Sequence, residues 1–148
     1  MAYPNALSAY RDTRIRTASQ GQLIIMLYDE AVKQLDRGLE FLEQDGSGKR
    51  DPASIEQVNK VVVKAQEIIT ELMVSLDFDR GGDIARNLFS LYTWFNRELL
   101  EANIARDLVR IRAVRTMMDE LRGAWNEIIA KTSAEEIGRP SGGVNIAG

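Results

Sequence analysis

Glu98 and Glu101, one helical turn apart, come closest to a metal-binding or catalytic pattern in this chain. Carboxylates at this spacing form half of the dinuclear metal sites of helical bundles, but those sites also draw a histidine from the same turn. The chain contains no histidine and no cysteine. Because the usual transition-metal ligands, the near-neutral proton carrier and the thiol nucleophile are all missing, we expect no metal site and no enzyme activity.

The glycine pair Gly81-Gly82 is the second pattern with possible chemistry. A phosphate-binding loop would continue with a lysine and a hydroxyl residue, and neither follows here. The pair therefore predicts the stop of one helix and the start of the next. Trp94 and Trp125 lie at helical spacing from other apolar residues, which favours packing positions over a cofactor site. We expect no cofactor.

The composition is that of one globular domain, with 148 residues, 45% of them hydrophobic and 28% charged. No apolar stretch approaches the ~18 residues that a membrane span needs, so we expect no membrane insertion. The N-terminus lacks the apolar core of a secretory signal, and no cysteine is present to pair in an oxidising compartment. A cytoplasmic location is therefore predicted.

Arginines between residues 106 and 122 make one segment locally basic. Asp107, Asp119 and Glu120 lie among these arginines, and the net charge of the whole chain is -3. This mixture is typical of a solvated helix face, and we expect no nucleic-acid partner.

Helical periodicity begins near Ser19, and no strand pattern competes with it along the chain. Ser19 suits a helix cap because Gln22 follows three residues later, and this first helix is predicted to run to about Gln44. Asp51 and Pro52 then suit the cap and the first turn of a second helix.

Residues 78–82 break the pattern, and Asp83 is predicted to cap a third helix that ends in a turn at residues 104–106. A fourth helix is predicted to end near Thr132. Since connections this short favour antiparallel neighbours, the expected fold class is all-α, an antiparallel (up-down) four-helix bundle. The predicted core faces are Ile24, Tyr28, Ala31, Leu35 and Leu42; Ile55, Val58, Val62, Ala65, Ile69, Leu72 and Leu76; Ile84, Leu88, Leu91, Phe95, Leu99 and Ala102; and Ile111, Val114, Met118, Leu121, Trp125 and Ile128.

Apolar residues outside these faces predict a binding surface. The first helix opens with an unbroken apolar and aromatic run at residues 23–28, which one core cannot hide because successive residues are rotated by about 100°. An outer groove lined by such residues can receive an amphipathic segment of another chain. A wide buried arc explains the same pattern equally well. The groove candidates are Leu23, Met26, Val63, Val74, Phe89 and Leu100, with Thr93 and Asn96 between the last two.

We divide the chain into a short N-terminal segment packed against the bundle (1–16), the helical bundle (17–132) and a flexible C-terminal tail (133–148). Leu7 and Tyr10 lie in the N-terminal segment, which has no strong period of its own. They belong either to a disordered leader, which the pattern alone favours, or to a flap over an apolar site.

Short motifs from residue 5 to residue 131 resemble the flagellar secretion chaperone FliS family, in order and with the expected gaps. A departure is Gln20, where the family usually has a proline that presets the first helical turn. The matching residues are Asn5, Ala9-Tyr10, Thr17-Ala18-Ser19, Leu27-Tyr28-Asp29, Asn59, Ala65, Ile68-Ile69, Glu71-Leu72, Gly81-Gly82-Asp83-Ile84-Ala85, Asn87-Leu88, Leu91-Tyr92, Leu100, Ala102-Asn103, Leu121 and Trp125-Asn126-Glu127-Ile128.

This resemblance implies a cytoplasmic, non-enzymatic export chaperone. It implies binding of the C-terminal segment of newly made flagellin in outer apolar grooves, which prevents premature polymerisation, and delivery to a component of the flagellar type III export gate. It also implies that the N-terminal segment covers part of the groove when flagellin is absent, so that Leu7 and Tyr10 act as a displaceable plug. We add the motif residues Leu27, Tyr92 and Asn103 to the expected groove and expect a monomer that binds one client.

The alternative function is a structural or regulatory bundle that associates with itself. The same outer apolar faces would then form a homodimer interface instead of receiving a client.

Overall fold

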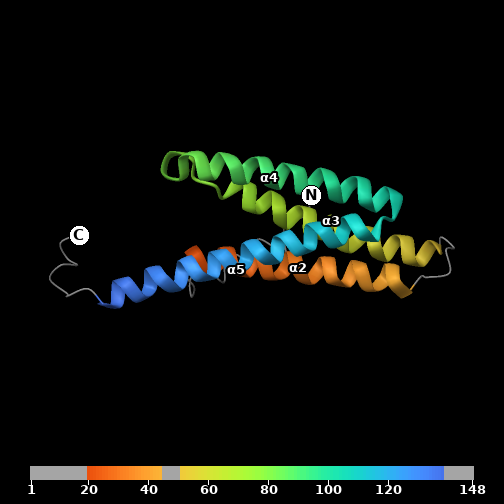
Figure 1. The fold of residues 1–148 in the computed structure, drawn as a ribbon. Coiled ribbons are helices and arrows are strands. Elements are labelled where there is room, and N and C mark those ends of the chain that lie inside the picture. The colour runs from red at the N-terminus through yellow and green to blue at the C-terminus, as the bar shows by residue number, and fades with distance from the viewer. Residues whose placement is uncertain (1–19, 45–50, 139–148) are drawn as a thin grey trace.

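The structure, a computed structural model, describes residues 20–44 and 51–138, with side chains up to Lys131. It contains the helices α2 (Gln20–Gln44), α3 (Pro52–Val74), α4 (Phe78–Ala105) and α5 (Leu108–Gly138) (Figure 1). The described residues include no strand, which confirms the all-α class. The predicted leader with Leu7 and Tyr10, the cap at Ser19 and residues 139–148 lie outside the described residues.

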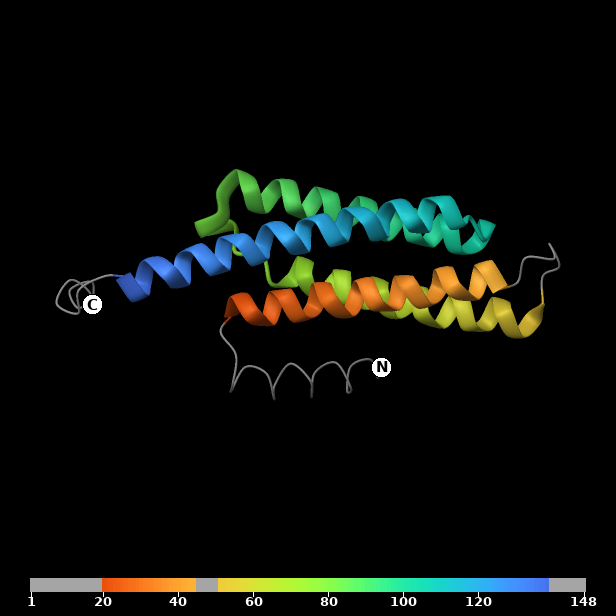
Figure 2. The ribbon, with the colours of Figure 1, turned by 60° about the horizontal axis from the view of Figure 1, so that its bottom comes forward.

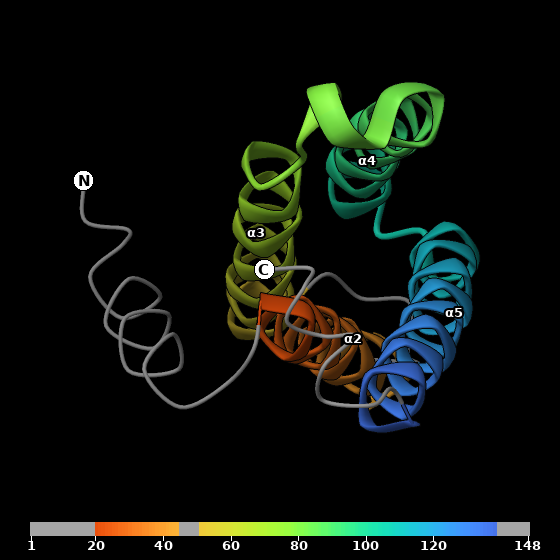
Figure 3. The ribbon, with the colours of Figure 1, turned by 90° about the vertical axis from the view of Figure 1, so that its left-hand side faces the viewer.

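Successive helices run in opposite directions, as Figure 2 shows. α2 packs against α3 and α5, and α4 packs against the same two helices. α2 and α4 therefore lie diagonally across the bundle from each other, as do α3 and α5 (Figure 3). The connections between α3 and α4 and between α4 and α5 are too short for any but an antiparallel neighbour, and the predicted up-down four-helix bundle is confirmed.

The core contains large side chains from every helix. Each apolar side chain of this size contributes about 1.5–3 kcal/mol when fully buried, so this interior is the main source of stability. The three-and-four spacing predicts most of it correctly. Fully buried examples are Tyr28 and Leu35 on α2, Ile69 and Leu72 on α3, Phe95 and Leu99 on α4, and Ile111 and Met118 on α5.

Three predicted core positions are wrong, since Ile55, Ile84 and Ile128 are 38%, 70% and 56% exposed. Ile55 lies in the first turn of α3, and Ile84 lies just after the kink in α4. Ile128 precedes Ile129, which contacts Gly21 in the first turn of α2. All three positions have the helical phase of the core but lie near the ends of the bundle, where neighbouring helices cover less of a side chain.

The start of α4 also differs from the prediction. The Asp77 carboxylate caps the helix by accepting hydrogen bonds from the backbone nitrogens of Asp79 and Arg80, each with a donor–acceptor distance of 3.1 Å. A short helical turn follows and ends at Gly82, whose φ of 50° and ψ of -124° are accessible to glycine and strained for other residues. Asp83 therefore begins the main part of α4 after a kink, and Asp77 caps the helix.

The other helix boundaries test the remaining predictions. Asp51 is the N-cap residue of α3 and Pro52 occupies the first turn, as predicted, although the Asp51 side chain makes no capping hydrogen bond. α5 continues to Gly138, so its predicted end near Thr132 is wrong. The intervening alanine, glutamates and isoleucine favour helix continuation, and glycine is a common residue at a helix C-terminus.

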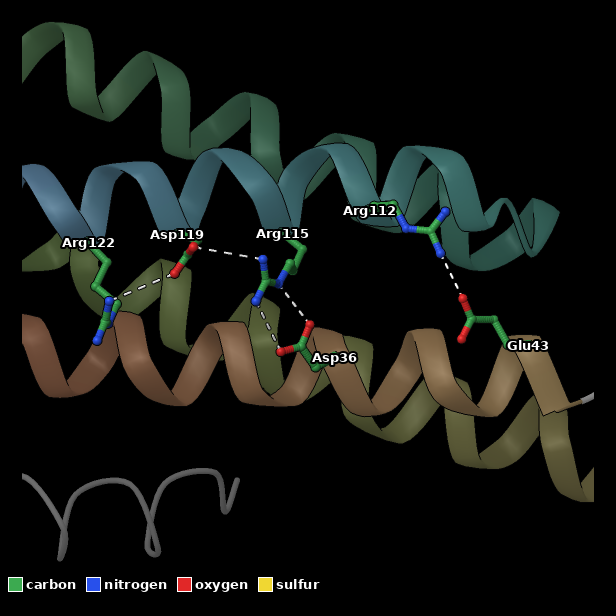
Figure 4. Close-up of polar contacts among 6 residues, drawn as sticks. All are labelled: Asp36, Glu43, Arg112, Arg115, Asp119 and Arg122. Atoms are coloured by element: carbon green, nitrogen blue, oxygen red, sulfur yellow. Dashed lines mark hydrogen bonds and ion pairs between the residues drawn. The ribbon is translucent and has the colours of Figure 1, made fainter.

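Ion pairs join α2 to α5 along their seam (Figure 4). Arg115 donates to the Asp36 carboxylate over 2.8 and 3.3 Å, and Arg112 donates to Glu43 over 2.7 Å. Asp119 lies between Arg115 and Arg122, 3.8 Å from each. The arginines that make the sequence locally basic are thus largely balanced by acidic partners, as expected for a solvated helix face.

Candidate binding surface

The outer face of the α3–α4 seam carries exposed apolar side chains. Val63 and Val74 on α3 are 39% and 75% exposed, and Phe89 and Leu100 on α4 are 42% and 52% exposed. The prediction that these residues lie outside the core is confirmed. We call the face formed by these residues, with Asn59, Thr70, Asn96 and Asn103, the α3–α4 face.

Two side-chain hydrogen bonds fix the register of this face. The amide nitrogen of Asn103 donates to Asn59 Oδ1 over 2.9 Å, and that of Asn96 donates to Thr70 Oγ1 over 3.2 Å. Moving one turn from Asn59 toward Thr70 reaches Val63, and moving one turn from Asn103 toward Asn96 reaches Leu100. Because the helices are antiparallel, these two apolar residues share one level of the seam, between the two polar bridges.

An aromatic pair continues the α3–α4 face toward the start of α4. The rings of Phe78 and Phe89 meet edge to face with centroids 5.9 Å apart. Thr93 lies one helical turn after Phe89 and is exposed. Its hydroxyl donates a hydrogen bond to the Phe89 carbonyl oxygen at 2.9 Å. The sequence reasoning missed Phe78, because its segment was read only as a break between helices.

A cavity of about 460 Å³ extends the face at its other end. Ile55 and Ile104 lie on its walls, together with the bridged pair Asn59 and Asn103. Ile104 is 70% exposed and was also missed, since it falls in the predicted turn. The sequence did contain a signal for Ile104, because a large apolar residue in a turn between helices is often exposed.

A second group of predicted site residues meets between α2 and α3. Leu23 and Leu27 on α2 and Val74 on α3 line a cavity of about 230 Å³. Leu23 and Leu27 are only 4% and 2% exposed, so they form its floor and belong to the core. Met26 is half-buried and is not among the residues that line this cavity. The prediction that the whole run at residues 23–28 exceeds one core therefore holds for only part of it.

A third cavity, of about 350 Å³, opens near the kink of α4. Ile24 on α2, Leu72 on α3, Leu88 and Tyr92 on α4, and Trp125 on α5 contribute to its lining. Tyr92 is 1% exposed, so its assignment to an open surface groove is corrected to a core position beneath a cavity. The reason is its hydrogen bond, since a tyrosine hydroxyl can be buried when it has a polar partner.

That partner is Tyr28, whose hydroxyl oxygen is hydrogen-bonded to the Tyr92 hydroxyl. Trp125 Nε1 also donates to the Tyr28 hydroxyl over 3.2 Å. Burial raises the pKa of both tyrosines above the ordinary value of 10.0, so both stay protonated at neutral pH. The cluster stabilises the bundle and offers no nucleophile or base.

Glu98 and Glu101, the carboxylates considered for a metal or catalytic site, form ion pairs with Arg110. Glu98 accepts from Arg110 over 3.0 and 2.9 Å, and Glu101 accepts from the same guanidinium over 2.6 Å. The hydrogen bonds from Arg110 hold the pKa of Glu98 below its ordinary value. In the described parts of the chain, no group of three or more acidic, histidine or cysteine side chains is placed to hold a metal ion. No helix among the described residues is long and apolar enough to span a membrane.

These features are those of a helical protein with an outer apolar face. A family model described as "Flagellar protein FliS" matches residues 3–132. The chain belongs to the FliS family. This confirms the resemblance carried by the short motifs.

Curated relatives of this FliS chain cover nearly the same length. The Flagellar secretion chaperone FliS of Bacillus subtilis is 29% identical over 144 residues, which cover 97% of this chain and 99% of that protein. The protein of the same name from Salmonella typhimurium is 35% identical over 126 residues, 84% of this chain and 87% of the relative. The Escherichia coli protein is 29% identical over 122 residues, 82% and 85% of the two chains. Because it belongs to the FliS family, this chain is a flagellar export chaperone, a class of protein that acts on a client protein.

Proposed function

We propose that this FliS chain binds the C-terminal segment of newly made flagellin on its outer apolar surface and keeps it from polymerising before export. The α3–α4 face is the observation that carries the proposal. Exposed apolar residues recur about every three turns on both helices there, where a folded monomer gains nothing from them. Membership of the FliS family supports a client that is a flagellar protein.

Sequestration is the mechanism that such a surface supports. A client stripe that lies on Val63, Leu100 and Phe89 is no longer available to neighbouring flagellin molecules. Each Leu or Phe side chain buried in such a contact contributes about 1.5–3 kcal/mol, so a few of them exceed the cost of association. The role needs no catalytic group and no cofactor, and it is cytoplasmic and non-enzymatic.

The cavity lined by Leu23, Leu27 and Val74 would extend the client surface onto α2. The N-terminal segment with Leu7 and Tyr10 would cover part of this surface until flagellin displaces it. Delivery to a flagellar export-gate component would then release the client, which requires the gate to distinguish loaded chaperone from free chaperone. We propose one client per monomeric chaperone.

Co-elution tests the proposal directly. The full chain is mixed with the C-terminal segment of flagellin from the same cell and analysed by size-exclusion chromatography with light scattering. A complex with the mass of one chaperone and one segment supports the proposal. Separate elution of the two chains at micromolar concentration would refute it. A concentration-dependent dimer of the chaperone that the segment does not dissociate would support the self-associating bundle instead.

A further inference from the structure

We infer that two side-chain bridges, Asn96–Thr70 and Asn103–Asn59, set the register in which a client helix lies on the α3–α4 face. The inference rests on the proposed function and adds the sequence pattern that the client must carry. The donating amides of Asn96 and Asn103 are separated by seven residues on α4, which corresponds to about 10 Å along the helix, and their acceptors Thr70 and Asn59 are separated by eleven residues on α3. The apolar level formed by Val63 and Leu100 lies between them.

The spacing on both helices is that of a coiled-coil seam. The positions on α4 are separated by four, three, four and three residues, and those on α3 by four, three and four. Two antiparallel helices with such lines form holes into which a third helix places side chains every three or four residues. The positions on α4 are Phe89, Thr93, Asn96, Leu100 and Asn103. Those on α3 are Asn59, Val63, Gln66 and Thr70.

An extended client segment would fit this face less well than a helix. An extended peptide gains affinity by pairing its main chain with the exposed edge of a sheet. The backbone groups of α3 and α4 are already paired within their own helices, and no strand occurs among the described residues. Side-chain packing is therefore the main interaction that the face offers, and a helix supplies it at the matching spacing.

The Asn96 side chain makes the fold less stable than an apolar side chain at this position would. Its Oδ1 atom is buried and has no hydrogen-bond partner among the described residues, while its Nδ2 atom donates to Thr70. A buried acceptor without a partner lowers stability, and an apolar residue here would remove that cost. A polar residue at such a seam position is the device by which coiled coils fix register at the expense of stability.

The bridges also define what the client must present. An amide nitrogen carries two hydrogens and a threonine hydroxyl keeps its own hydrogen when it accepts, so the Asn96–Thr70 bridge retains donors for a partner. A client residue such as Ser, Thr, Asn or Gln can accept them, whereas a Leu would bury the bridge against a methyl group. Because the donating amides of Asn96 and Asn103 are seven residues apart on α4, the client helix is expected to carry two hydrogen-bonding residues seven positions apart, with an apolar residue between them.

The test is a set of double-mutant cycles between the full chaperone and the C-terminal segment of its own flagellin. Each Ser, Thr, Asn and Gln of the segment is changed to Leu in turn, and the dissociation constant is measured by isothermal titration calorimetry. With the wild-type chaperone, two substitutions seven residues apart should each weaken binding about tenfold, because each leaves a bridge facing an apolar group. With the chaperone N96L/N103L, both penalties should disappear.

The matched control is Asn126→Leu, the same change at an exposed position on α5, which should keep both penalties. If the added volume of N96L/N103L lowers its helicity, N96A/N103A removes both amides without adding volume and should likewise relieve both penalties. Equal penalties with wild-type and seam variants, or penalties at positions that are not seven apart, would overturn the inference. Absence of any complex with the wild-type chaperone would instead overturn the proposed function on which it rests.

Discussion

The hydroxyl oxygens of Tyr28 on α2 and Tyr92 on α4 are hydrogen-bonded to each other inside the bundle. These helices lie diagonally across the bundle and do not pack directly against each other. Trp125 on α5 donates to the same Tyr28 hydroxyl, so side chains of three helices meet at one polar cluster in the core. The two tyrosines are 0% and 1% exposed, and their hydroxyls satisfy one another away from water.

Removing one hydroxyl should destabilise the bundle. Tyr92→Phe leaves the Tyr28 hydroxyl without its partner on α4, and we expect the free energy of unfolding to fall by about 1–3 kcal/mol. Urea unfolding followed by circular dichroism measures it. The double variant Tyr28→Phe/Tyr92→Phe should lose less than the sum of the two single variants, because the two hydroxyls share one bond. Additive losses would show that the two residues do not interact.

High pH should weaken the same contact. Burial raises the pKa of Tyr28 and Tyr92 above 10.0, the value expected in the unfolded chain. Above about pH 10 the unfolded state releases these protons and the folded state retains them, so stability is full below this pH and falls as pH rises. The melting temperature of the wild type should therefore drop between about pH 9 and 11 more steeply than that of Tyr28→Phe/Tyr92→Phe. Parallel curves would contradict this origin.

The kink at Gly82 should not tolerate a side chain. Gly82 has φ of 50°, so Gly82→Ala is strained although no atom lies within 4 Å of its added methyl group. We expect the free energy of unfolding to fall by about 1 kcal/mol or more. Gly123→Ala is the control, because Gly123 lies within α5 and has equal open space. This variant should be more stable than wild type by about 0.5–1 kcal/mol, since alanine favours helix.

A charge on the α3–α4 face should weaken client binding without unfolding the chaperone. Phe89→Asp and Leu100→Asp each place a carboxylate where the proposed client contact is apolar, and we expect binding to weaken at least tenfold. Ser90→Asp adds the same charge at the exposed neighbouring position, and it should bind nearly as wild type does. Calorimetry and circular dichroism give the two readouts. Loss of helicity in Phe89→Asp would assign Phe89 to the core instead.

Arg110 should control the ionisation of Glu98. Its hydrogen bonds lower the pKa of that carboxyl from the ordinary value of 4.5. Arg110→Met removes them, and the titration midpoint of Glu98 measured by carbon NMR should move upward. Because the folded-state pKa of Glu98 is lowered, the pair stabilises the fold above pH 4.5 and this contribution disappears as pH falls. An unchanged midpoint would show that the pair does not form in solution.

Local sequence patterns predicted the helices and much of the core. Spacing of three and four placed Val62, Phe95 and Met118 correctly inside, because a helix presents one stripe to its neighbours whatever the neighbours are. The same spacing misassigned Ile84, since a repeat has no information about where the bundle ends. The exposure of Phe89 and Leu100 was predicted correctly, because these residues lie outside the buried stripe of their own helix.

Contacts between distant residues decided the rest. Tyr92, predicted to line the groove, lies in the core because its hydroxyl is hydrogen-bonded to Tyr28 across the bundle. No local sequence pattern indicates a partner 64 residues away. The bridges at Asn96 and Asn103 likewise depend on the register of α3 against α4. The sequence by itself determined the helices, the absence of histidine and cysteine and the family. Only the tertiary structure decided which apolar side chains on the core stripe stay exposed, such as Ile84, because their exposure depends on how far the neighbouring helices extend alongside.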